Sequence, residues 1–274
     1  MSILRRATRS LGWEISRISD IAYPYTREYA VEKRSVKIWI TNSESRSWYD
    51  LESDKNEAEI KNIFKLLKPT DRILEIGCNH GVFTCLIADR LGTNGFVLGV
   101  DAIPSNCMVA NAQLALNNLC SKARILNLVL SDRQSRIELA NTMNGSVYRG
   151  DRSDKKRTNY RESIIVDSVC GDQLDEMYGP FNFLKIDVEG YEGVVLRGCK
   201  NILARKPKLE IELHQRNLIE GYGSSLTEIL DLVKVENYCV RMVVRPSYEE
   251  IEFDTRLVDS TIFGVMAFFA PLVA

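Results

Sequence analysis

The sequence predicts an α/β protein built around a doubly wound, mostly parallel β-sheet. Apolar strand patterns alternate with helix patterns from residue 72 onward, which is typical of parallel strands joined by crossover helices. At residues 73–81 an apolar strand runs into a turn with two glycines, and a helix follows. The chain has 274 residues, 45% of them hydrophobic, so it can bury one large core.

The first half of the predicted core has clear boundary signals. Residues 36–41 alternate between apolar and polar side chains as in a strand. Ser53 is the candidate N-cap of a helix over residues 54–67, and Pro104 stands in the first turn of a helix over residues 104–119. The other elements expected here are strands at 72–76, 96–100 and 125–130 and a helix at 82–91.

The second half is interrupted by the polar stretch 141–160, between strands expected at 136–140 and 163–169. Residues 149–161 hold six basic and two acidic side chains. This segment is either a solvated surface loop or a lid that binds a polar or anionic acceptor. The remaining expected elements are strands at 183–186, 209–213, 239–244 and 261–269 and helices at 191–204 and 225–236.

Residues 1–54 are expected to form an N-terminal accessory, and residues 55–274 the main domain. The first 22 residues have the pattern of a short basic helix with a narrow apolar face. That face either packs on the body of the protein or contacts a membrane surface through residues 1–20. The segment has no apolar core of the kind found in secretory signals, so the expected location is cytoplasmic, either free or peripheral to a membrane.

Composition excludes several classes of protein. The formal net charge is -1, which argues against nucleic-acid binding through bulk positive charge. Seven cysteines without CxxC spacing suit neither a zinc knuckle nor a disulfide framework. The two histidines, His80 and His214, are too few for a histidine-rich metal site. No stretch reaches the ~18 apolar residues of a transmembrane helix.

The turn after the first core strand has the pattern of a nucleoside site. Gly77 and Gly81 let the backbone turn sharply and the next helix approach closely, with Asn79 between them. Asp101 ends the next strand and can accept both hydroxyls of a ribose. Glu75 would repel a pyrophosphate but suits a ligand that carries a sulfonium and an ammonium group. The pattern therefore favours S-adenosylmethionine over a dinucleotide.

A second segment, LKIDVEGYE at residues 184–192 followed by VLRG at 195–198, is more specific. Here the chain resembles the FkbM family of class I S-adenosylmethionine-dependent methyltransferases. The resemblance covers roughly residues 55–270. It implies a Rossmann-like fold with an antiparallel last strand and S-adenosylmethionine as cofactor. It also places Asp132 after the third strand, where its carboxylate could accept from the adenine amino group.

The same resemblance places the chemistry at two neighbouring strand ends. Asp187 lies at the carboxyl end of a central strand, where ligands bind in open parallel sheets, and Lys185 shares its face. Glu189 follows as a further catalytic candidate, and His214 ends the next strand as a candidate general base. An alternative makes Asp187, Glu212 and His214 ligands of a divalent metal such as Mg²⁺ or Mn²⁺.

The predicted activity is methyl transfer from S-adenosylmethionine to a hydroxyl oxygen. The resemblance implies a small-molecule acceptor: a sugar, a glycan or glycolipid, or a natural product. An RNA methyltransferase is one alternative, supported only by the basic segment 149–161 and unlikely on net charge. A non-catalytic, membrane-associated cofactor-binding scaffold is the other, and the intact glycines and strand-end carboxylates argue against it.

Overall fold

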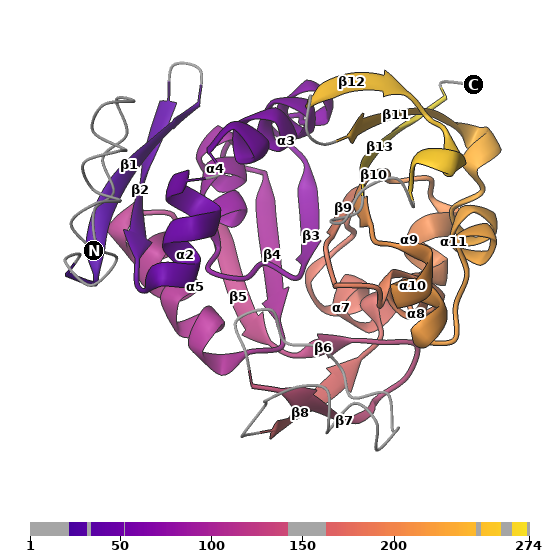
Figure 1. The fold of residues 1–274 in the computed structure, drawn as a ribbon, viewed down its shortest axis with the longest axis horizontal. Helices are drawn as coiled ribbons and strands as arrows, with labels where there is room; N and C mark the ends of the chain where they lie inside the picture. The colour runs from indigo at the N-terminus through magenta and orange to yellow at the C-terminus, as the bar shows by residue number, and fades with distance from the viewer. Residues whose placement is uncertain are drawn as a thin grey trace, which may run out of the picture.

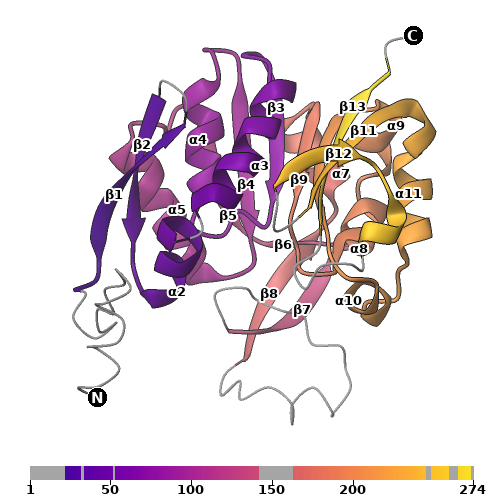
Figure 2. The same cartoon turned by 45° about the horizontal axis from the view of Figure 1, so that its top comes forward.

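The computed structural model of the chain describes residues 22–31, 34–51, 53–141, 163–244, 248–258 and 265–272. Its main sheet has the strand order β12-β11-β13-β10-β9-β3-β4-β5, drawn in Figures 1 and 2. Neighbouring strands from β10 to β5 are parallel, whereas β13 runs antiparallel to β10 and to β11. The predicted Rossmann-like fold with an antiparallel last strand is confirmed.

The strands of the main sheet follow the expected pattern of short apolar runs. Each central strand is almost completely buried because helices cover both of its faces. The strands, in chain order, are β3 (Arg72–Ile76), β4 (Phe96–Asp101), β5 (Ala123–Asn127), β9 (Phe183–Ile186), β10 (Lys208–Leu213), β11 (Tyr238–Val244), β12 (Glu249–Glu252) and β13 (Val265–Pro271).

Two hydrophobic clusters, one on each face of the sheet, show that the sheet is doubly wound. One face packs against α3 (Ser53–Leu66), α4 (Val82–Arg90) and α5 (Pro104–Leu116). The helices on the other face are α7 (Gly171–Tyr178), α8 (Glu192–Arg197), α9 (Lys200–Ala204), α10 (Arg216–Gly221) and α11 (Leu226–Val233). None of the described helices is long and apolar enough to cross a membrane.

The described part of the N-terminal segment packs directly on the first of these faces. It forms a hairpin of β1 (Tyr25–Val31) and β2 (Arg34–Ile40), then α2 (Ser43–Arg46) and the π-helical turn η2 (Ser47–Leu51). Ile38, Ile40 and Tyr49 lie in the same hydrophobic cluster as the helices of that face. The expected basic helix falls almost wholly in residues 1–21, outside the described part of the chain.

A second, three-stranded sheet lies at the carboxyl edge of the main sheet (Figure 2). It consists of β6 (Val129–Leu130), β8 (Ser163–Val169) and β7 (Ser135–Ala140), in that order. The single strand expected at 125–130 was therefore wrong, since the chain divides it between β5 and β6 in two sheets. The basic segment 149–161 lies outside the described residues.

The helix expected at 191–204 was also wrong, because it is broken into α8 and α9 around Gly198. A Cβ on Gly198 would lie 2.0 Å from the carbonyl oxygen of Ser131, so the loop after β6 crosses the chain there. Sequence patterns also missed β1, β12, α7 and α10, which are short or only weakly periodic. The remaining helix, expected at 225–236, ends earlier, at Val233, and the Ser225 side chain caps its start by accepting from the Glu228 N–H.

Gly81 allows a test of close helix packing. Its φ is +72°, and a Cβ would lie 2.8 Å from the Cβ of Ala110 on α5. Gly223 has a similar φ of +70° but open space around it. We expect Gly223→Ala to cost about 1–2 kcal/mol through backbone strain alone, and Gly81→Ala to cost a further ~1–3 kcal/mol through overpacking. Urea unfolding measures both; equal losses would contradict the close packing.

Candidate active site

The turn after β3 brings two distant parts of the chain into contact. Gly77 has a φ of +84°, and a Cβ there would lie 1.8 Å from the carbonyl oxygen of Asp187. The Asp187 N–H donates to the carbonyl oxygen of Ile76 over 2.9 Å. Because only glycine fits this approach, the glycine turn and the end of β9 form one continuous surface.

Asp101 ends β4 beside the same turn. Its carboxylate accepts hydrogen bonds from the N–H groups of Asn79 and Ile103, both over 2.8 Å, and from the Asn106 amide over 3.1 Å. Burial raises the pKa of Asp101 to about 6, although these hydrogen bonds act in the opposite direction. The structure thus places the predicted ribose acceptor next to Asn79, as the sequence pattern requires.

Tyr49 is a site residue that sequence reasoning missed. Its hydroxyl donates to the Asn79 side-chain oxygen over 3.0 Å, and its ring lies 6.1 Å from that of His80. Burial raises the pKa of Tyr49 well above 10, and the carboxylates of Asp187 and Asp101 add to this effect. No motif marks this residue, because its position depends on how the N-terminal segment packs against the turn.

Lys185 and Glu75 lie in a buried charge cluster under the site. The Lys185 ammonium is 2.8 Å from the Glu59 carboxylate and 3.0 Å from that of Glu210, and its side chain is 4% exposed. Glu75 pairs in register with Lys185 and accepts from the Thr84 hydroxyl over 2.5 Å. These contacts hold the Lys185 ammonium in buried ion pairs, and its expected catalytic role stays a prediction.

His214 lies at the centre of a second cluster, at the ends of β9 and β10. Its Nδ1 is 2.6 Å from Glu192 Oε1, and its Nε2 is 3.4 Å from Glu189 and 3.9 Å from Asp187. Burial alone would lower the pKa of His214, but the carboxylates of Glu192, Glu189 and Glu212 hold it well above 6.5. These carboxylates therefore favour the protonated form of His214.

Glu192, the last residue of the motif at 184–192, has a position at the start of a helix, where carboxylates are favoured. It begins α8 but is fully buried, and its Oε1 contacts both His214 and the N–H of Gly190. The alternative metal site combined Glu212 with Asp187 and His214. Among the described residues, the donor groups that lie within 4.8 Å of one another are instead those of Asp187, Glu189 and His214.

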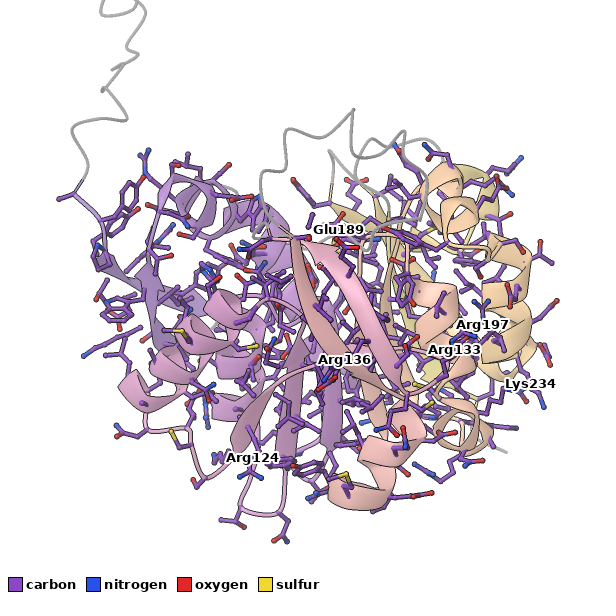
Figure 3. All side chains as sticks on the ribbon, turned by 90° about the horizontal axis from the view of Figure 1, so that it is seen from below. Arg124, Arg133, Arg136, Glu189, Arg197 and Lys234 are labelled. Carbon is purple, nitrogen blue, oxygen red and sulfur yellow. The ribbon has the colours of Figure 1, made fainter. Side chains whose placement is uncertain are left out.

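The expected position of Asp132 was wrong. The third strand of the main sheet, β5, ends at Asn127, and Asp132 follows β6 in the small sheet. Its carboxylate lies 3.6 Å from Arg197 and 3.8 Å from Arg133, two arginines that Figure 3 shows beside each other. Its role in adenine recognition stays a prediction.

The sheet is doubly wound, with a glycine turn after one central strand and a carboxylate after the next. A polar cluster lies at the adjacent strand end. This arrangement is typical of the class I methyltransferases. Residues 75–240, more than half of the chain, match the family model described as the Methyltransferase FkbM domain. The chain belongs to this family, as the resemblance indicated.

Curated relatives match over shorter segments. The chain is 34% identical to the ribosomal RNA large subunit methyltransferase E of Brachyspira hyodysenteriae over 65 residues, 24% of this chain and 31% of that protein. It is 29% identical to the Buchnera aphidicola protein of the same name over 106 residues, 38% of this chain and 45% of that protein. The match thus spans less than half the length of either relative.

Solved structures with a similar fold have low sequence identity to this chain. An rRNA methylase from Streptococcus thermophilus has a TM-score of 0.47 and 9% identity, with 80% of this chain and 97% of that chain covered. An O-methyltransferase from Bacillus cereus in complex with SAH has a TM-score of 0.41 and 14% identity, with 78% and 81% covered.

The raised pKa of Asp101 makes cofactor binding depend on pH. We expect the affinity for S-adenosylmethionine to fall as the pH drops through about 6, because the protonated carboxyl accepts the ribose hydroxyls poorly. Calorimetry between pH 5 and 8 measures this trend. Asp101→Asn should bind more weakly and lose the dependence; a wild-type affinity unchanged at pH 5 would contradict the assignment.

The buried charge cluster should make the free energy of unfolding fall as the pH rises. A salt-bridged acid with a lowered pKa has the opposite effect. Burial raises the pKa of Glu75 to about 7 from 4.5, so the folded protein holds a proton that the unfolded chain loses. Stability should fall by up to about 3 kcal/mol as the pH rises between these values. Urea unfolding of ligand-free protein should show a flatter profile for Glu75→Gln; identical profiles would rule out this contribution.

Proposed function

We propose that the protein transfers the methyl group of S-adenosylmethionine to a hydroxyl oxygen. The observation that carries this proposal is the cluster of Asp187, Glu189 and His214, whose donor atoms lie within 4.8 Å of one another directly beside the glycine turn. A hydroxyl must lose its proton as its oxygen forms the new bond, and carboxylates with an imidazole can receive it.

The residues present fit the donor. Asp101 can accept the ribose hydroxyls, since its carboxylate lies beside the glycine turn and is bonded to the Asn79 N–H. The carboxylates of Asp187 and Glu189 provide a negative surface for a sulfonium. When bound, the donor supplies a methyl group whose bond to sulfur breaks as the oxygen–carbon bond forms, and the sulfonium becomes a neutral thioether.

Within this cluster, Asp187 and His214 are the groups that can receive the proton. The pKa of His214 is well above 6.5 because of the carboxylates around it. A positive charge beside those carboxylates opposes their effect, so a bound sulfonium lowers the pKa of His214. The imidazole then becomes a proton acceptor only in the loaded site, which couples proton removal to cofactor binding.

For the acceptor, the family resemblance favours a sugar, a glycan or glycolipid, or a natural product. RNA is a second candidate, favoured by the two curated relatives, which are ribosomal RNA methyltransferases by name. The net charge of -1 argues against RNA. Release of S-adenosylhomocysteine over panels of sugars, lipids and RNA would decide between them, and a gel shift that weakens steeply with salt would support RNA.

For location, we propose the cytoplasm, with contact to a membrane surface through residues 1–20. The arginines and the apolar face of that segment support this proposal. Flotation with anionic liposomes, compared between the full chain and a chain lacking residues 1–20, tests the contact. Equal flotation of both proteins would contradict it.

Two substitutions should separate cofactor binding from proton transfer. We expect His214→Ala to lower kcat by roughly 10²-fold or more. S-adenosylmethionine should still bind, with a Kd no higher than in the wild type, because the variant lacks the protonatable imidazole that competes with the sulfonium. Asp101→Ala should instead raise that Kd. Calorimetry and S-adenosylhomocysteine release measure the two quantities, and full turnover by His214→Ala would remove His214 from the mechanism.

A further inference from the structure

The end of β9 and the end of β10 present three different donor groups to one point. Asp187 and Glu189 come from the loop after β9, and His214 follows β10. One donor atom of each lies within 4.8 Å of the others, and the His214 Nε2 is 3.4 Å and 3.9 Å from the two carboxylates. Ligand atoms at adjacent positions of an octahedral Mg²⁺ site lie ~3 Å apart. The two carboxylates are each about a third exposed, and rotation of these side chains would bring their oxygens to that separation from Nε2.

The histidine is held in the orientation that a metal ligand needs. Its Nδ1 contacts the fully buried Glu192 over 2.6 Å, which fixes the Nδ1–H and turns Nε2 toward Asp187 and Glu189. Histidines that bind metals usually donate their second ring N–H to a carboxylate in this manner. The Glu192 carboxylate is itself held by the N–H of Gly190 over 3.0 Å.

The negative charges around His214 also favour the binding of a cation. Asp187, Glu189 and Glu192 surround one imidazole, and among the described residues none of the three forms an ion pair with a lysine or arginine. One oxygen of Glu192, Oε2, is buried without a hydrogen-bond partner in the described part of the chain. With His214 protonated, these three carboxylates and the imidazole carry a formal net charge of about -2. The charge of the fully buried Glu192 in particular needs compensation.

We propose that Asp187, Glu189 and His214 bind one divalent cation, with Glu192 as the positioning residue for His214. Two carboxylates with a single imidazole suit Mn²⁺ or Mg²⁺. Three protein ligands leave coordination positions open for water and for the oxygen of the acceptor. A hydroxyl bound there becomes more acidic and gives its proton to solvent. This inference rests on the proposed methyl transfer and refines it, because the ion then replaces proton removal by His214.

The test is Mn²⁺ binding to protein that has been treated with chelator and dialysed, measured by calorimetry and by electron paramagnetic resonance. We expect one saturable site in the wild type. Asp187→Asn and His214→Ala should weaken it at least tenfold, and Glu192→Gln by roughly 10–100-fold. Asp167→Asn serves as the matched control, because Asp167 pairs with Arg136 on the exposed face of the small sheet, and its affinity should not change.

Far-ultraviolet circular dichroism and a thermal melt show whether each variant is folded. S-adenosylmethionine binding by the wild type, measured without Mn²⁺, separates the two proposals. A wild type that binds S-adenosylmethionine but has no saturable Mn²⁺ site overturns the metal site and leaves the proposed function standing. Equal Mn²⁺ affinity in Asp187→Asn and wild type also overturns it. Saturable Mn²⁺ binding without S-adenosylmethionine binding supports the metal site and counts against the proposed function.

Discussion

The contact between the turn after β3 and the end of β9 is the constraint on which the site depends. At Gly77 the backbone carbonyl of Asp187 occupies the space of a Cβ, and the Asp187 N–H is bonded to the strand that precedes the glycine. Because β3 and β9 are neighbours in the sheet but more than a hundred residues apart in the chain, this contact joins the two halves of the fold. It places the glycine turn and the Asp187–Glu189 loop on one surface, so a methyl donor bound at the turn, as proposed, faces the acidic strand end.

The buried charge cluster beneath this contact holds three strands in register. Glu75, Lys185 and Glu210 occupy paired positions on β3, β9 and β10, and Glu59 reaches the lysine from α3. The cluster holds one ammonium among three carboxylates. Burial raises the pKa of Glu75 and that of Glu210, which favours a bound proton on this group. Such a cluster lowers the stability of the fold near neutral pH. A shift in strand register would separate the buried charges from their partners, so the cluster favours a single alignment of the strand ends.

The sequence was sufficient where function depends on local geometry. Gly77 and Gly81 were predicted because a strand, a sharp turn and a helix follow one another, and Asp101 because it ends the next strand. Tyr49, Glu59 and Glu192 were not predicted, because each acts on a residue distant in sequence: Asn79, Lys185 and His214. The broken helix at Gly198 has the same cause, since the Ser131 carbonyl that interrupts it comes from a loop 67 positions earlier. The periodicity of a segment indicates which of its side chains face the core. It carries no information on which distant part of the backbone packs against that segment.

The near-zero net charge of the chain therefore hides a strong local asymmetry. Asp101, Asp187, Glu189, Glu192 and Glu212 all lie at the carboxyl edge of the sheet, where His214 is bonded to Glu192 and adds at most one positive charge. An edge of this kind attracts cations and repels phosphates, which agrees with a sulfonium donor and with the missing pyrophosphate fingerprint. Binding a cation there also relieves repulsion among the carboxylates. Repulsion among these carboxylates destabilises the ligand-free protein, and its relief contributes free energy to cation binding. A sulfonium, the proton on His214 and a divalent ion therefore compete for the same negative surface.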